Sequence, residues 1–213
     1  MIFEKNDKLV MIGESITDCE RQKPIGEGLF GALGNGYVSL FNALLQSKYP
    51  DNGIRVVNMG ISGNTTRNLK ERWQTDVMDL KPDWVSIMIG VNDVWRQFDV
   101  PQIKESHVYL DEYRATLTEL VEKTLPEVKG LILITPFFIE KNRDDAMRSR
   151  LDEYNEVVKE VAAEYNLLHV DVQSAIDQLL EYKYSAELAW DRVHPSLTGH
   201  MTIANEILKI VEN

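Results

Sequence analysis

The chain has 213 residues, and its 23 Lys and Arg against 34 Asp and Glu give a formal net charge of −11. This length predicts a single domain over residues 1–213. A content of 44% hydrophobic and 27% charged residues excludes a mainly disordered chain. The negative charge argues against nucleic acid or an anionic membrane surface as a partner. The single cysteine, Cys19, excludes an internal disulfide framework and a thiolate zinc site.

The beginning of the chain lacks a basic region followed by a long apolar core, so no secretory signal peptide is predicted. No apolar run approaches the roughly 18 residues that a membrane-spanning helix needs. We therefore expect a soluble, cytoplasmic protein.

Short apolar runs alternate with longer segments in which apolar residues recur at helical spacing. In chain order, strands are predicted over Lys8–Ile12, Ile54–Asn58, Trp84–Ile89, Gly130–Thr135 and Leu167–Val170. Helices are predicted over Tyr37–Lys48, Thr66–Leu80, Tyr109–Leu125, Ala146–Tyr165, Val172–Tyr182 and Thr198–Val211. This alternation predicts a three-layer α/β/α fold, in which helices cover both faces of a sheet of about five parallel strands.

Two segments, Asp18–Gly36 and Val94–His107, are too long for simple connections between these elements. The first contains several glycines, which favour an irregular loop over a helix. Long loops in compact domains often carry function, so both segments are candidates for the surroundings of a site.

Polar clusters follow three of the predicted strands, at the edge of the sheet where ligands of such folds bind. They are Gly13-Glu14-Ser15, Gly60-Ile61-Ser62-Gly63-Asn64-Thr65 and Gly90-Val91-Asn92-Asp93, and a fourth cluster, Asp191-Arg192-Val193-His194-Pro195, precedes the last helix. Taken alone, each cluster has a structural interpretation. The first matches a helix-capping pattern from Ser15 to Asp18, the second a turn with a helix cap, and the third an Asx turn.

Together, the clusters supply every group that ester hydrolysis by a serine requires. Ser15 is the candidate nucleophile, His194 the general base, and Asp191 the carboxylate that orients the imidazole. The backbone N–H groups of Ser15 and Gly63 and the side-chain amide of Asn92 are candidate donors to the oxyanion. The other histidines, His107, His169 and His200, lack such a set of partners, and His169 lies inside a predicted apolar strand, where a core histidine is the better interpretation.

In the order of these four clusters the sequence resembles the SGNH, or GDSL-type, esterase superfamily. The four letters denote a serine, a glycine, an asparagine and a histidine in separate blocks, which correspond here to Ser15, Gly63, Asn92 and His194. The blocks span nearly the whole chain. The resemblance implies a flavodoxin-like SGNH hydrolase fold and a serine esterase that needs no cofactor and works through an acyl-Ser15 intermediate.

The first block departs from the family pattern, because Glu14 and Ile16 stand where the family usually has Asp and Leu. The nucleophile is intact, so the departure concerns how the serine loop is held. There is no G-x-S-x-G motif, which excludes the ordinary α/β-hydrolase arrangement.

Within the superfamily, the sequence is most similar to intracellular bacterial acetylxylan esterases, which remove acetyl groups from xylo-oligosaccharides and assemble into homo-oligomers. The similarity rests on Ser15-Ile16-Thr17-Asp18-Cys19, Val91-Asn92-Asp93-Val94-Trp95 and Trp190-Asp191-Arg192-Val193-His194-Pro195. It implies a small acetylated substrate and a homo-oligomeric enzyme.

Trp95 and Trp190 adjoin two of the blocks and are candidates for binding a sugar ring, although both are equally compatible with packing at the rim of the sheet. Two other functions remain open. One is a thioesterase or lysophospholipase with the same catalytic groups, and the other is a carbohydrate-binding protein without activity. A metal hydrolase is disfavoured, because Asp191 and His194 supply only two ligands.

Overall fold

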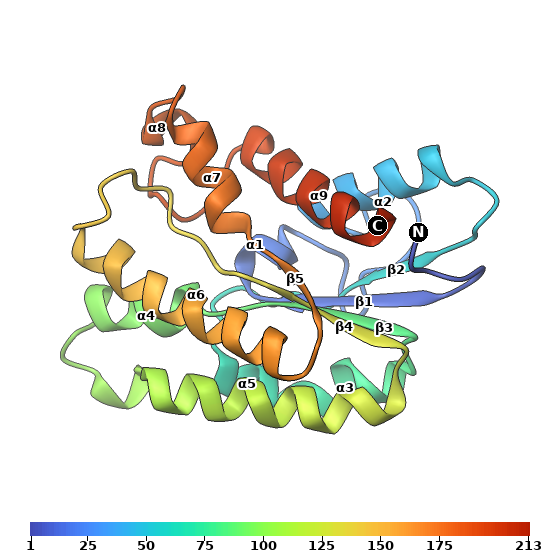
Figure 1. Cartoon of the computed structure of the whole chain (residues 1–213), viewed down its shortest axis with the longest axis horizontal. Coiled ribbons are helices and arrows are strands. Elements are labelled where there is room, and N and C mark those ends of the chain that lie inside the picture. Colours follow the sequence, from blue (N-terminus) through green and yellow to red (C-terminus); the bar gives the residue numbers. More distant parts are fainter.

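The computed structural model describes residues 1–213, and a five-stranded parallel sheet lies at its centre (Figure 1). The strands are β1 (Lys8–Gly13), β2 (Arg55–Asn58), β3 (Trp84–Met88), β4 (Gly130–Ile134) and β5 (Leu168–Val170). Their order in the sheet is β2-β1-β3-β4-β5, the doubly wound order in which the chain reverses direction on either side of β1. The inner strands are almost continuously buried, as expected for a parallel sheet covered on both faces.

Nine α-helices surround the sheet. They are α1 (Ser15–Asp18), α2 (Tyr37–Lys48), α3 (Thr66–Asp76), α4 (Val91–Asp99), α5 (Leu110–Thr124), α6 (Ala146–Glu164), α7 (Val172–Leu180), α8 (Ser185–Leu188) and α9 (Leu197–Glu212). Short 3₁₀ helices occur at η1 (Met78–Leu80), η2 (Lys104–Ser106) and η3 (Leu125–Glu127). In Figure 1, α2, α7 and α9 lie on one face of the sheet and α3, α4, α5 and α6 on the other.

This architecture confirms the predicted three-layer α/β/α fold and all five predicted strands, with ends that differ by at most one residue. The prediction for the loop 18–36 is also confirmed, since no helix or strand lies between α1 and α2. The two chain ends lie side by side, where the amide of Ile2 donates to the carbonyl of Val211 at 2.8 Å (Figure 1).

The segment Val94–His107, which is too long for a simple connection, contains helices that were not predicted. Residues 91–99 form α4, and η2 occupies residues 104–106. The apolar side chains of α4 share one face, on which Val91 and Val94 are buried, Trp95 packs against the core and Phe98 is 42% exposed. The run is only nine residues long and has two polar residues in its first turn, so the sequence also fits a turn followed by a connection. Asn92 and Asp93 therefore belong to the first turn of a helix and not to an Asx turn.

The helix predicted over Thr66–Leu80 is interrupted at Val77 and ends as the 3₁₀ helix η1, and α8 was not predicted at all. Both differences affect single turns at the surface, which lack a periodic apolar pattern.

The register of the sheet decides where the site lies. Gly13 pairs with Met88 and Met11 with Asn58, so β1, β2 and β3 end at one edge of the sheet.

Candidate active site

Ser15 is the first residue of the single-turn helix α1, directly after β1. Glu14 is the N-cap of this helix, and its carboxylate accepts hydrogen bonds from the amide of Ile16 at 3.0 Å and from the Ser15 hydroxyl at 2.8 Å. The predicted capping role of Ser15 is therefore wrong. Gly13 allows the tight exit from β1, because a Cβ atom there would lie 2.5 Å from the carbonyl oxygen of Met88.

The side chains of Ser15, His194 and Asp191 form a continuous line of hydrogen bonds. The Ser15 Oγ lies 2.9 Å from His194 Nε2, and His194 Nδ1 lies 2.6 Å from Asp191 Oδ2. A proton on Nδ1 that is donated to the carboxylate leaves the Nε2 lone pair facing the serine hydroxyl. The arrangement has the geometry of a nucleophile, a general base and an orienting carboxylate.

The Asp191–His194 segment turns back on itself. The amides of Val193 and His194 both donate to Asp191 Oδ1, at 3.0 and 2.9 Å. Burial of Asp191 opposes ionisation, but the hydrogen bonds from His194 and Val193 outweigh this effect and lower the pKa of the carboxyl below its usual value. Asp191 is therefore held as a carboxylate, the form that accepts the Nδ1 proton.

Arg192 adopts a left-handed conformation, with φ of 64°, inside this turn. Its guanidinium donates to Glu140 at 2.8 Å and to Asp145 at 3.2 Å, and lies 4.8 Å from the centre of the Phe138 ring. Its carbonyl accepts from the amide of Ile139 at 2.8 Å. These contacts hold a backbone conformation that a non-glycine residue rarely adopts.

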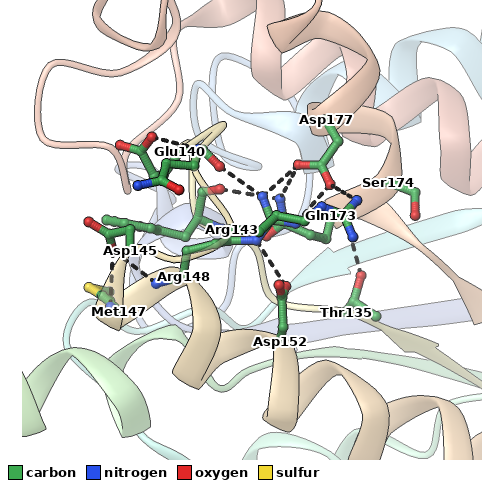
Figure 2. A network of polar contacts seen from close by, with 12 residues as sticks. Thr135, Glu140, Arg143, Asp145, Met147, Arg148, Asp152, Gln173, Ser174 and Asp177 are labelled. Carbon is green, nitrogen blue, oxygen red and sulfur yellow. Dashed lines mark hydrogen bonds and ion pairs between the residues drawn. The ribbon is translucent and has the colours of Figure 1, made fainter.

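The segment 140–145, which carries the two carboxylates that bind Arg192, is held in place by the buried Arg148 (Figure 2). The guanidinium of Arg148 donates to the Glu140 carbonyl at 2.8 Å, to both oxygens of Asp177 at 2.7 Å and to Asp152 at 2.9 Å. A buried arginine with all its partners in place fixes the path of residues 140–145. The Asp–His turn therefore rests on a polar network that the sequence analysis did not identify, and only the adjacency of Arg192 to Asp191 pointed towards it.

The loop that contains Gly63 follows β2 and is joined to the serine helix. Asp18 in α1 accepts from the amide of Ser62 at 3.1 Å. Gly63 has a φ of +81°, which favours glycine, and its N–H has no acceptor within the protein. This free amide, next to a residue bound to the serine helix, suits the donor role predicted for it.

Asn92 lies in the first turn of α4, after β3, and is buried. Its Nδ2 donates to the carbonyl of Asn64 at 3.0 Å, and its Oδ1 accepts from Arg96 at 3.3 Å. These two contacts settle which way the amide points, and one N–H of the amide remains without an acceptor in the protein. Ser15, Gly63 and Asn92 thus follow three adjacent strands, and hydrogen bonds join the segments that carry them.

Asn58, the last residue of β2, has a structural role that the sequence did not predict. Its side chain is fully buried, donates to the carbonyls of Thr17 at 2.6 Å and Leu33 at 2.8 Å, and accepts from the amide of Gly60 at 2.9 Å. Asn58 therefore holds the serine helix and the Gly63 loop together. An asparagine at the end of a largely apolar strand was the only indication of this role in the sequence.

The two tryptophans differ. The Trp95 ring lies 5.9 Å from the His194 ring, centre to centre, and lines a cleft of about 270 Å³. The side chains around this cleft belong to Trp95, Phe98, Asp99, Phe138, Asp145, Ala146, Met147, Asp191 and Arg192. Trp190 is 87% exposed and does not line the cleft. The structure therefore brings Trp95 to the Asp–His pair and leaves Trp190 on the surface.

The remaining histidines lie apart from the Ser15–His194–Asp191 line. His107 contacts the Tyr109 hydroxyl and the Val100 carbonyl, and His169 is partly exposed in β5. His200 accepts from the amide of Tyr37 at 3.2 Å and lies 3.7 Å from the Cys19 sulfur. No cluster of three or more His, Cys, Asp or Glu side chains is arranged to hold a metal ion. None of the helices is both long and apolar enough to cross a membrane.

Comparisons with known proteins agree with this geometry. The profile of the GDSL-like lipase/acylhydrolase family matches residues 11–201. An acetylxylan esterase from Geobacillus stearothermophilus is 61% identical over 209 residues, which cover 98% of this chain and 95% of that protein.

Solved structures are similar over the same length. The crystal structure of Axe2, an acetylxylan esterase from Geobacillus stearothermophilus, has a TM-score of 0.99 at 59% identity, covering 100% of this chain and 97% of that one. LAE5, an alpha/beta hydrolase enzyme from the metagenome of Lake Arreo, Spain, has a TM-score of 0.98 at 54% identity, covering 100% and 98%. Other Axe2 structures are of catalytic mutants, S15A, D191A and H194A. The resemblance stated from the sequence is confirmed: the chain belongs to the GDSL-like lipase/acylhydrolase family and is a carboxylic ester hydrolase.

Proposed function

We propose that the protein is a serine esterase that removes acetyl groups from small acetylated carbohydrates such as xylo-oligosaccharides, through an acyl-Ser15 intermediate. The observation that carries the proposal is the hydrogen-bonded line from Asp191 through His194 to Ser15, with distances of 2.6 and 2.9 Å. The substrate class is supported by the identity of 61% to an acetylxylan esterase over nearly the whole chain. No metal or cofactor takes part in this mechanism.

In the first half of the reaction, the Ser15 oxygen attacks the acetyl carbonyl carbon while His194 Nε2 takes the hydroxyl proton. The carbonyl oxygen becomes an oxyanion, which the N–H groups of Ser15 and Gly63 and the Asn92 amide stabilise. The bond from the acetyl carbon to the sugar oxygen then breaks, and His194 gives its proton to that oxygen. The products are the free sugar hydroxyl and acetyl-Ser15.

In the second half, water attacks the acetyl carbon and gives a proton to His194. The bond to the Ser15 oxygen breaks, the proton returns to Ser15, and acetate leaves. Asp191 stays ionised throughout and stabilises the imidazolium that forms in each half.

Trp95 and Trp190 are proposed to contact the carbohydrate. The cleft beside Asp191 supports this role for Trp95, because its aromatic side chains suit the apolar face of a sugar ring and its charged side chains suit the hydroxyl groups. The exposed position of Trp190 places it outside the cleft, so its contact requires a substrate that extends beyond one ring.

We also propose that the chain is one SGNH hydrolase domain over residues 1–213, that it is cytoplasmic, and that it forms a homo-oligomer. Exposed apolar side chains support an interface between copies. They include Leu29, Phe30, Tyr182, Tyr184, Trp190 and Leu197. A high negative charge disfavours nucleic acid and an anionic membrane as partners.

The test is acetate release from acetylated xylo-oligosaccharides, measured beside acetyl and long-chain acyl esters. We expect acetate release by the wild-type protein, little hydrolysis of long-chain esters, and no turnover by Ser15→Ala. A preference for long-chain esters or thioesters would retain Ser15 as the nucleophile but replace the substrate class. Binding of the acetylated sugar without turnover that depends on Ser15 would contradict the enzyme mechanism.

A further inference from the structure

The guanidinium of Arg72, in α3, joins two segments that lead to the candidate catalytic groups, the end of β1 and the loop after β2. It donates to the carbonyl of Gly13, two residues before Ser15, at 3.0 Å and to the carbonyl of Met59, after β2, at 2.8 Å. It also donates to Asn64 Oδ1, next to Gly63, and to the carboxylate of Asp76 on the same helix, each at 2.7 Å. The side chain is only 13% exposed, so water competes little for these acceptors.

Two acceptors of Arg72, the carbonyls of Gly13 and Met59, lie where the chain leaves β1 and β2. Gly13 is the last residue of β1, and its carbonyl also accepts from the amide of Ile61, in the Gly63 loop, at 3.2 Å. One guanidinium therefore fixes the exits of β1 and β2 relative to each other. The planar fork of an arginine holds several acceptors in fixed directions, which the single ammonium of a lysine does not.

The contacts of Arg72 with Gly13, Met59 and Asn64 together form what we call the clamp. Asn64 connects this clamp to a third segment, the start of α4. Its side-chain oxygen accepts from Arg72, and its carbonyl accepts from Asn92 Nδ2 at 3.0 Å. The direction of the Asn92 amide thus depends on the position of the Asn64 peptide, which Arg72 holds from the other side. Gly63 precedes that peptide, and a glycine has more backbone freedom than any other residue.

We propose that Arg72 is a positioning residue for the oxyanion site, which aligns the Gly63 N–H and the Asn92 amide through Asn64. The proposal rests on the proposed function of these two donors. An oxyanion site acts only where its donors are fixed within a few tenths of an ångström before the reaction, so a clamp on both donors is expected to affect turnover more than substrate binding.

The structure offers a matched control on the same helix. Arg67 also pairs with a carboxylate, Glu112 at 2.8 Å, and donates to the carbonyls of Glu105 at 2.8 Å and His107 at 3.2 Å. These acceptors lie in the segment that leads into α5 and not in the three segments of the site. Arg67→Gln removes an ion pair and two hydrogen bonds to backbone carbonyls, as Arg72→Gln does, without touching Gly13, Met59 or Asn64. The Arg67 side chain is more exposed than that of Arg72, 39% against 13%.

The experiment measures kcat, KM and the pH profile on a small acetyl ester for wild type, Arg72→Gln, Arg72→Lys and Arg67→Gln. We expect Arg72→Gln to lower kcat by roughly 10²-fold, near the loss of one oxyanion donor, with KM changed less than about threefold. Because the Ser15–His194–Asp191 line is untouched, the pH profile should keep its shape. Arg72→Lys should restore part of kcat, and Arg67→Gln should stay close to wild type.

A double-mutant cycle with Asn92→Ala separates positioning from general destabilisation. If Arg72 acts through Asn92, then Arg72→Gln costs less than about tenfold once Asn92 is already alanine. A full, additive loss in that background, or an unchanged kcat for Arg72→Gln, would overturn the proposal.

Asn64→Ala provides the same test if Arg72→Gln does not fold, since it removes one acceptor of Arg72 and keeps the carbonyl that binds Asn92. We expect it to lower kcat without changing KM, whereas wild-type kcat would overturn the proposal. Failure of the proposed function can be told apart from failure of the Arg72 proposal. If the proposed function is wrong, the wild-type protein itself shows no turnover that depends on Ser15.

Discussion

Glu14 is a buried acid beside the nucleophile, and it competes with His194 for the hydrogen of the Ser15 hydroxyl. Burial raises the pKa of Glu14, although hydrogen bonds from Ile16 and Ser15 and the nearby His194 act in the opposite direction. The hydroxyl has one hydrogen and two nearby acceptors, Glu14 at 2.8 Å and His194 at 2.9 Å. The hydrogen can be donated to only one of them at a time, so the proposed proton transfer requires the hydroxyl to turn from Glu14 to His194.

The role of Asp191 is tested by Asp191→Asn. The amide retains an oxygen for the Val193 and His194 amides, but its NH₂ group faces His194 Nδ1 and favours the tautomer with the proton on Nε2. We expect a loss of about 10⁴-fold in kcat, the typical effect of a wrong tautomer in such a triad, with an unchanged fold by circular dichroism. Asp171→Asn, at the N-cap of α7, is the control and should retain activity. A rate within tenfold of wild type for Asp191→Asn would show that the orienting carboxylate is another residue.

At the scale of elements, the contact between α3 and α4 holds two sides of the candidate oxyanion site. Asp93, fully buried in α4, accepts from the amide of Thr66 at 3.0 Å and from the Thr66 hydroxyl, at the start of α3. Burial raises the pKa of Asp93 to about 7, although the hydrogen bonds from Thr66 lower it. The folded protein therefore binds a proton at this position over a pH range in which the unfolded chain has released it.

This difference predicts how stability depends on pH. The contribution of Asp93 is fully present below about pH 4, declines as the pH rises, and is lost above about pH 7. Asp93→Asn cannot titrate, so we expect its free energy of unfolding, relative to wild type, to improve by up to roughly 4 kcal/mol between pH 4 and pH 8. Urea unfolding of both proteins at the two pH values measures this change. If the unfolding free energies of wild type and Asp93→Asn differ by the same amount at pH 4 and pH 8, then Asp93 is ionised in the folded protein over this whole range.

At the scale of the whole molecule, two groups stand out among the exposed apolar side chains. Leu29 and Phe30 lie in the loop between α1 and α2, and Tyr184 and Trp190 flank α8. Exposed aromatic and aliphatic groups that lie close together are typical of an interface and are uncommon on monomers. The proposed homo-oligomer gives both groups a partner.

Sedimentation analysis of the wild-type protein should therefore give a mass that is a multiple of 24.4 kDa. Replacing Leu29 and Phe30, or Tyr184 and Trp190, with serine should shift the protein towards smaller species, because each pair removes apolar area from an interface. Ile103→Ser, which lies outside both groups, is the control. A wild-type protein that sediments as one chain at micromolar concentration would contradict the proposed assembly.

The sequence by itself determined the alternation of strands and helices and the four polar clusters, because each depends on residues close together in the chain. The spacing of Asp191 and His194 also belongs here, since a carboxylate three residues before an imidazole reaches it through one turn. Even so, the helix α4 escaped prediction, because its apolar pattern spans only nine residues and its first turn contains polar residues that also fit a turn at the end of a strand.

Only the tertiary structure decided how these clusters meet. The clamp of Arg72 joins residues 13, 59 and 64, and the network of Arg148 supports the turn at Arg192 from two other elements. It also decided that Trp95 lies against His194 whereas Trp190 is exposed. The physical reason is that such contacts depend on the register of the strands and the packing of the helices on them. Neither leaves a pattern among neighbouring residues, so a hydrogen bond between distant side chains becomes visible only in the folded chain.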